Sequence, residues 1–145
     1  MKVQVEEIQD KPNEIWAGVI DVYEIDILKH HIKFNITVLE NGEKTSCCIL
    51  FKGVSSYHFY EDSQMQRLNP IEPDEGDYSE LTSINFIKNG VGNIKIEAST
   101  ERWVEQYYSN ANFILEIWNS MLFIEAKCIT INGIEYDVQY PNIEK

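Results

Sequence analysis

The chain has 145 residues, with 12 Lys and Arg against 24 Asp and Glu, and a formal net charge of −12. Hydrophobic residues at 43% and charged residues at 25% are typical of a globular protein, and the length predicts a single domain over residues 1–145. The acidic balance argues against nucleic acid and against an anionic membrane as direct ligands, because both attract clustered basic side chains.

The beginning of the chain lacks the apolar segment and cleavage site of a secretory signal, and no apolar run reaches the roughly 20 residues of a membrane helix. Three cysteines, of which Cys47 and Cys48 are adjacent, do not suggest a disulfide framework. We therefore expect a soluble, cytoplasmic protein whose cysteines are small apolar fillers.

The first third of the chain predicts strands joined by tight turns. A first strand is predicted at residues 15–28, where apolar and polar residues alternate from Tyr23 to Ile27. Residues 32–38 alternate throughout, which is the period of a half-buried strand. Asn41-Gly42 favours a type I′ turn, so residues 45–51 are expected to pair back on the preceding strand. Gly53 is expected to end that strand, and an aromatic-rich extended segment follows at residues 54–60.

Residues 61–80 have a different composition, with prolines, few aliphatic residues and seven acids against Arg67. We interpret them as a long acidic surface loop within the domain. Beyond the loop, residues 81–87 and 94–98 flank the turn cluster at residues 88–93, and we expect them to form a second hairpin.

The last third of the chain is again rich in β-branched and aromatic residues. A short helix is expected over residues 100–108, with Thr100 as its N-cap. Strands are then predicted at residues 113–118 and 122–131. Asn132-Gly133 is a hairpin turn into the alternating residues 134–138, and the tail at residues 139–145 is expected to fray.

These elements predict a mainly β protein, all-β or α+β. We expect seven or eight strands and one or two short helices, with tight turns that make an antiparallel sheet more probable than a parallel one. The sheet is expected to be twisted and to form a partial barrel or sandwich.

Searches for catalytic and metal-binding motifs find no support for an enzyme. The chain lacks the phosphate-binding, dinucleotide-binding, nucleophile-elbow and zinc-protease motifs, and residues 74–77 lack the spacing of a calcium loop. A histidine-based metal site would require His58 or Cys48 to converge on His30 and His31. We therefore predict no catalytic residues, no metal and no cofactor.

Aromatic residues set among acids are the candidate binding surface. Rings supply buried contact area in protein interfaces, and carboxylates attract a basic partner. The alternative places Trp103 and Tyr107 in the core, and the acids on a surface that only maintains solubility. The candidate partner-binding residues are Glu72, Asp74, Glu75, Asp77, Tyr78, Glu80, Trp103, Tyr107 and Tyr108.

Two segments resemble the YxiG-like family of small acidic Bacillus proteins: residues 50–57 (LFKGVSSY) and residues 115–127 (LEIWNSMLFIEAK), each next to an Asn-Gly hairpin. The resemblance extends from about Trp16 to Val138. Its members resemble the small proteins encoded beside secreted polymorphic toxins, many of which are immunity proteins. The resemblance implies a binding module that neutralises a cognate toxin, and it carries over no catalytic residues.

We therefore expect an immunity-type inhibitor that binds a cognate toxin, for example a basic nuclease, through the acidic residues 72–80 and nearby aromatics. Two alternatives remain open. One is a small-molecule-binding protein or enzyme built in the mouth of a β-barrel. The other is a structural subunit with a stoichiometric partner that is not a toxin.

Overall fold

The computed structural model describes residues 18–40, 42–61, 80–117 and 120–141. Its main feature is one antiparallel sheet of nine strands in the order β11-β10-β3-β2-β1-β5-β8-β9-β4. In the first half of the chain the strands are β1 (Gly18–Asp26), β2 (His31–Glu40), β3 (Glu43–Lys52), β4 (Ser56–Glu61) and β5 (Glu80–Phe86). In the second half they are β8 (Phe113–Ile117), β9 (Ser120–Glu125), β10 (Cys128–Ile131) and β11 (Ile134–Asp137).

A second, two-stranded sheet pairs β6 (Ile94–Lys95) with β7 (Tyr108–Ser109). Between these two short strands lies the 3-10 helix η2 (Arg102–Gln106). Its N-cap is Glu101, without a side-chain capping hydrogen bond, so Thr100 is not the cap that the sequence suggested. In the described ranges no helix is long and apolar enough to cross a membrane.

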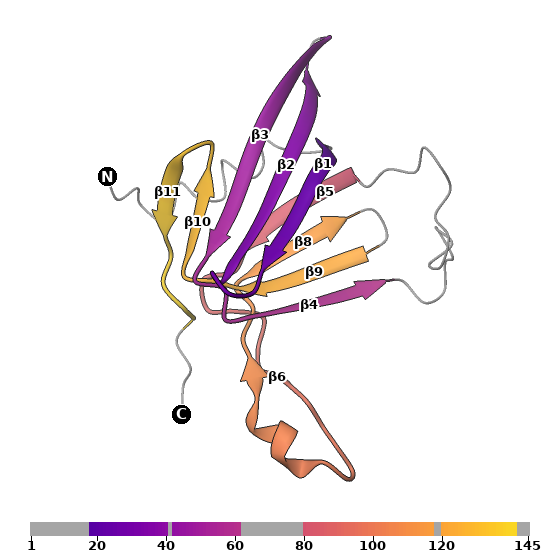
Figure 1. Ribbon diagram of the computed structural model, residues 1–145, viewed down its shortest axis with the longest axis vertical. Coiled ribbons are helices and arrows are strands. Elements are labelled where there is room, and N and C mark those ends of the chain that lie inside the picture. The colour runs from indigo at the N-terminus through magenta and orange to yellow at the C-terminus, as the bar shows by residue number, and fades with distance from the viewer. Residues whose placement is uncertain (1–17, 41, 62–79, 118–119, 142–145) are drawn as a thin grey trace.

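The nine-stranded sheet folds over on itself between β1 and β5. Strands β11 to β1 run nearly vertically in Figure 1, whereas β5, β8, β9 and β4 run nearly horizontally across them. The junction is short, because β1 pairs with β5 only through Gly18 and Val19. The sheet does not close, since β4 and β11 are its two outermost strands. A mainly β fold with a partial barrel or sandwich is therefore confirmed.

The core is built from rows of side chains that face inward from successive strands. In the β1–β2 half, one row runs from Tyr23 through Phe34 to Ile49. In the other half, one row runs from Leu115 through Leu122 to Phe59. Period-two alternation places these residues on one face, and the middle members of the rows are fully buried.

Aromatic rings join the two halves of the sheet at the centre of the core. The Phe113 ring of β8 lies 5.0 Å from the Phe51 ring of β3, centroid to centroid, in a T-shaped arrangement. Phe113 also lies 5.3 Å from Phe86 of β5. Tilted and edge-to-face pairs at these distances are favourable beyond the area that they bury.

Both predicted Asn-Gly hairpins join the expected strands. β2 pairs with β3 from His31–Lys52 to Glu40–Glu43, and Gly42 has a φ of 79°. β10 pairs with β11 around Asn132 and Gly133, which have φ angles of 50° and 84°. Positive φ at both central turn positions is what a type I′ turn requires.

Several local predictions are wrong. Residues 81–87 and 94–98 do not form a hairpin, because β5 pairs with β1 and β8 whereas β6 pairs with β7. The eleven strands of the described ranges exceed the predicted seven or eight, partly because the run at residues 122–131 divides at Ala126 and Lys127.

The predicted fraying of the tail is also wrong as far as Pro141, because residues 139–141 pack against the rest of the protein and Pro141 is buried. The Tyr140 hydroxyl donates to the Gly53 carbonyl at 2.7 Å. The predicted acidic loop lies outside the described residues, except that Glu61 ends β4 and Glu80 begins β5.

Candidate functional site

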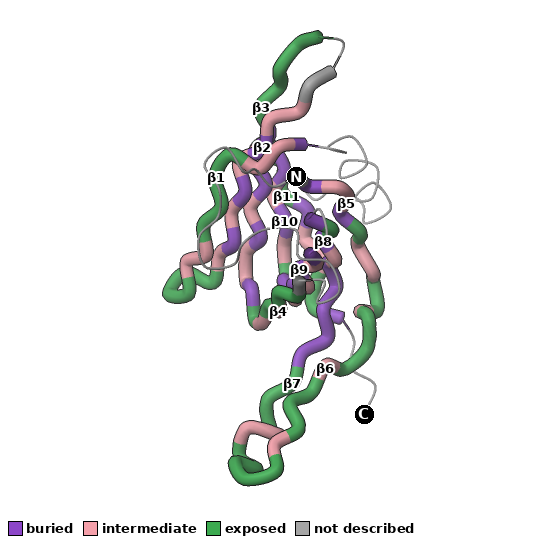
Figure 2. Tube along the Cα trace, turned by 90° about the vertical axis from the view of Figure 1, so that its right-hand side faces the viewer, coloured by how far each residue is buried: buried purple, intermediate pink, exposed green. Residues whose placement is uncertain are grey.

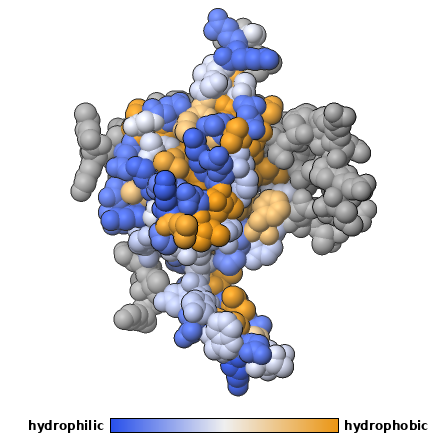
Figure 3. Space-filling view, viewed as in Figure 1, coloured by the Kyte–Doolittle hydropathy of each residue, from blue (hydrophilic) through white to orange (hydrophobic). Residues whose placement is uncertain are grey.

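A projecting arm, residues 91–109, carries the exposed aromatic residues of the candidate site. It contains β6, η2 and β7 and extends away from the sheet in Figures 1 and 2. The side chain of Trp103 is 62% exposed and that of Tyr107 is 57% exposed, and Tyr108 and Ile96 are similarly open. Figure 3 shows the arm below the sheet with pale and orange residues among blue ones. The alternative that Trp103 and Tyr107 belong to the core is therefore wrong.

Local contacts hold the exposed rings in defined positions. The Trp103 Nε1–H donates to a Glu101 carboxylate oxygen at 3.0 Å, and the Trp103 and Tyr107 ring centroids lie 6.3 Å apart and nearly perpendicular. Glu105 forms an ion pair with Arg102 at 3.6 Å and accepts a hydrogen bond from the Ala98 N–H at 3.4 Å. The arm therefore presents ordered rings beside carboxylates.

Asn110 stabilises the base of the arm, where both of its ends join the sheet. Its Oδ1 accepts from the Gly92 N–H at 2.9 Å, and its Nδ2 donates to the Asn89 carbonyl at 3.1 Å. Its main-chain N–H donates to the Glu125 carboxylate at 2.8 Å. Gly90 lies directly against the Asn110 side chain, and an added Cβ would come within 1.9 Å of Oδ1. The arm is thereby tied to β9.

Asn112 makes a second set of buried hydrogen bonds near the base of the arm. Its Nδ2 donates to the Ala126 carbonyl at 2.8 Å, and its Oδ1 accepts from the Ala126 N–H at 3.0 Å. The Asn112 side chain is fully buried. The Asn112 side chain thus makes the two hydrogen bonds to Ala126, between β9 and β10, that a neighbouring strand would otherwise make.

We expect Asn112→Ala to lower the free energy of unfolding by about 2 kcal/mol, because it leaves the buried N–H and carbonyl of Ala126 without these partners. Urea unfolding followed by circular dichroism measures the change. The control is Asn93→Ala, at an exposed asparagine of the arm, with an expected effect within about 0.5 kcal/mol. Equal effects in the two variants would contradict the role given to Asn112.

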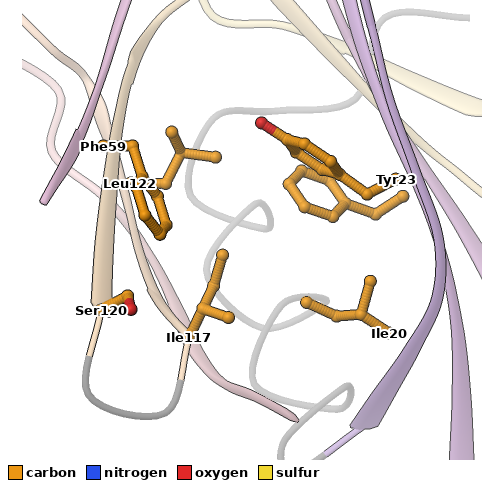
Figure 4. Close-up of a pocket in the computed structure, with 7 residues that line it drawn as sticks. Ile20, Tyr23, Phe59, Ile117, Ser120 and Leu122 are labelled. Atoms are coloured by element: carbon orange, nitrogen blue, oxygen red, sulfur yellow. The ribbon is translucent and has the colours of Figure 1, made fainter. Parts of the chain in front are cut away.

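A cavity of about 290 Å³ opens between β1 and β4, at the corner where the sheet does not close. In Figure 4, Ile20 and Tyr23 point from one side toward Phe59, Leu122 and Ile117 on the other. The remaining lining residues are Phe34 and Ser120. Burial, and to a lesser degree the nearby Tyr57 phenol, raise the pKa of Tyr23 above its ordinary value. The phenol therefore stays protonated at neutral pH.

Histidine and cysteine do not come together as a metal site in the described residues. His30 and His31 line a second cavity, of about 370 Å³, at the turn between β1 and β2. His58 lies elsewhere, with its Nε2 2.9 Å from the Ser109 hydroxyl at the base of the arm. The three cysteines are free thiols, and burial raises the pKa of Cys47. Nothing in the described ranges groups three or more His, Cys, Asp or Glu residues around a potential metal position.

The structure brings together part of the predicted binding set. Trp103, Tyr107 and Tyr108 lie on the arm with Glu101 and Glu105. Glu80 begins β5. The remaining predicted residues lie outside the described ranges: Glu72, Asp74, Glu75, Asp77 and Tyr78.

The sequence did not indicate which residues line the cavity, nor the role of Asn110 and Asn112. Alternation in β1 was visible in the sequence, but it does not reveal that β1 pairs with β5 only at Gly18 and Val19 or that β4 is an outermost strand. Asn110 and Asn112 follow the predicted helix at residues 100–108, and nothing in the local sequence indicates a buried amide.

Comparison with known proteins gives two matches. A family model described as YxiG-like protein matches residues 8–136. The chain is also similar to the uncharacterized protein YxiG of Bacillus subtilis (strain 168). The identity is 26% over 120 residues, which covers 79% of this chain and 83% of that protein. Because the family match spans most of the sequence, the chain belongs to the YxiG-like family.

Proposed function

We propose that the protein is a cytoplasmic binding protein of the immunity type, which neutralises a cognate toxin by direct contact rather than by catalysis. The observation that carries the proposal is the arm, which holds Trp103 and Tyr107 away from the core. The toxin is inferred to be basic, as nucleases are, because the inhibitor has a formal net charge of −12.

Exposed tryptophan and tyrosine are favourable contacts for a protein partner. They bury a large area with few rotatable bonds and are enriched among the residues that dominate binding free energy. The bond from the Trp103 indole to Glu101 reduces the ordering that a partner would have to impose. These features support the arm as the central contact.

The attraction of a basic partner is assigned mainly to charge outside the arm. The arm itself has three acids and two basic residues, whereas residues 72–80 have five acids and no base. We therefore propose a division of roles, in which residues 72–80 accelerate encounter and the aromatic residues of the arm hold the complex together.

We expect the triple variant Asp74→Lys, Glu75→Lys, Asp77→Lys to associate with the toxin about tenfold or more slowly at low salt, with a smaller difference at high salt. Stopped-flow association kinetics measures the effect. The control reverses three exposed acids elsewhere, Glu24, Glu43 and Glu116, and changes the net charge equally. Equal slowing in both triple variants would remove the specific role of residues 72–80.

The experiment that tests the function is an affinity pull-down with the full chain as bait. The bait meets host lysate supplemented with the product of the adjacent upstream gene, at low and high salt, and mass spectrometry identifies the eluate. Stoichiometric retention of a basic toxin domain, with more release at high salt, supports the proposal. Retention of a stoichiometric partner that is not a toxin, or of the bait alone, contradicts it.

The alternative function, binding of a small molecule in the mouth of the sheet, rests on a separate observation, which is the cavity between β1 and β4.

A further inference from the structure

The cavity between β1 and β4 is lined by residues that have the positions of core residues, and none of the described strands covers them. Tyr23 ends the row that continues through Phe34 to Ile49, and Phe59 ends the row that continues through Leu122 to Leu115. Their neighbours in these rows are fully buried, whereas Tyr23 is 45% exposed and Phe59 is 52% exposed. Two aromatic side chains thus face each other across an open corner.

Among the described strands, β4 has no second neighbour and β1 has one only at its start. β4 pairs with β9 alone among the described strands, and β1 pairs with β5 only at Gly18 and Val19. Beyond Val19, β1 no longer pairs with β5. The floor of the resulting cavity is formed by Phe34 and Leu122, so the opening reaches the core.

The size and lining of the cavity indicate a compact apolar occupant. Its volume of about 290 Å³ is close to the lower end of ligand pockets in proteins, which is about 300 Å³. It is also larger than the apolar cavities of about 150 Å³ that bind benzene. Aliphatic residues on the walls and aromatic rings at the rim suit an aromatic molecule of about two or three rings.

The charge around the cavity determines which such molecules are favoured. Five strands contribute lining residues. Four of them, β1, β4, β8 and β9, contain at least one carboxylate each and no Lys or Arg, whereas β2 contains Lys33 and Glu40, so these strands together carry a net negative charge. An anionic ligand would therefore approach against a negative potential, whereas an uncharged or cationic one would not. The nearby phenols of Tyr23 and Tyr57 supply polar groups beside the mouth.

We propose that the open corner between β1 and β4 is a binding site for a small, uncharged or cationic aromatic compound. The compound would insert its rings between Tyr23 and Phe59 and cover the exposed ends of the two core rows. This site is distinct from the arm and does not depend on the proposed binding of a toxin.

The test uses two dyes with the same ring skeleton, of which one is anionic. The full chain is titrated with uncharged N-phenyl-1-naphthylamine and with 8-anilinonaphthalene-1-sulfonate, and the dye fluorescence is recorded. We expect saturable binding of one uncharged dye per chain, with weaker binding of the sulfonate and a smaller difference at high salt. Absence of saturable binding, or tighter binding of the sulfonate at low salt, would overturn the proposal.

Variants then locate the dye. Phe59→Ala is expected to weaken binding of the uncharged dye about tenfold, because it removes one wall of the site. The control is Tyr60→Ala, since Tyr60 is the next residue of β4, is 51% exposed and faces the opposite side of the sheet. Equal weakening in these two variants would place the dye elsewhere and contradict the assignment.

Two more variants test whether a loss of dye binding comes from the cavity itself, rather than from unfolding of the protein or from a contact on the arm. Ile20→Trp adds apolar volume inside the cavity and is expected to reduce dye binding at least as much as Phe59→Ala, with the circular dichroism spectrum unchanged. Trp103→Ala, on the arm, is expected to leave dye binding within about twofold, since its indole is far exposed and outside the cavity lining. Loss of dye binding in the arm variant would overturn the site, whatever the result for toxin binding.

Discussion

Phe113→Ala should lower the free energy of unfolding by about 3–5 kcal/mol, which is the range for removal of a buried phenylalanine from a core. The Phe113 side chain is fully buried and contacts rings from both halves of the folded sheet, Phe51 at 5.0 Å and Phe86 at 5.3 Å. Because these neighbours belong to different strands held by separate hydrogen bonds, they cannot readily collapse into the space that the ring leaves. Urea unfolding with linear extrapolation measures the loss.

The matched control is Phe123→Ala, on the outer face of the neighbouring strand β9. Phe123 is partly buried and contacts Tyr60 with a centroid distance of 5.7 Å. Its removal is expected to cost less than half as much as that of Phe113, because water can reach the site and no closed cavity remains. An equal loss from both substitutions would show that the packing between the two halves of the sheet does not dominate stability.

The strands and hairpin turns were predictable because their determinants are local. Alternation in residues 32–38 and the turn at Asn41-Gly42 determine which face is buried and which strand follows, within a few residues of each other. The partner of β5 was not predictable in this way. Residues 81–87 have a turn after them, but that turn leads into the arm, and the strand that pairs with β5 begins at Phe113.

The candidate site was partly predictable for the same reason. Trp103 and Tyr107 are four residues apart, and this spacing suits one face of a short helix whether the face is buried or exposed. Their exposure follows from the outward projection of the arm, which depends on the bonds of Asn110 and Asn112 to β9 and its neighbouring peptide. The cavity requires residues from five strands, so its existence depends on the incomplete closure of the sheet.

Trp103→Ala is expected to weaken toxin binding by about 2 kcal/mol or more, which is about 30-fold in the dissociation constant. The substitution removes the largest exposed ring of the arm together with its contact to Tyr107. Because the side chain is 62% exposed in the free protein, the free energy of unfolding should change by no more than about 0.5 kcal/mol. Isothermal titration calorimetry with the purified toxin domain measures the first change, and urea unfolding measures the second.

Two further variants make this result specific to the arm. Trp103→Phe keeps an aromatic ring but loses the Nε1–H that donates to Glu101, so we expect an affinity between those of the wild type and Trp103→Ala. Ile134→Ala removes an exposed apolar side chain on β11, the outermost strand opposite β4, and should leave the affinity within about twofold. If the toxin binds Trp103→Ala as tightly as the wild type, the arm is not the central contact. An affinity loss in Ile134→Ala that exceeds the loss in Trp103→Ala would move the interface to the opposite edge of the sheet.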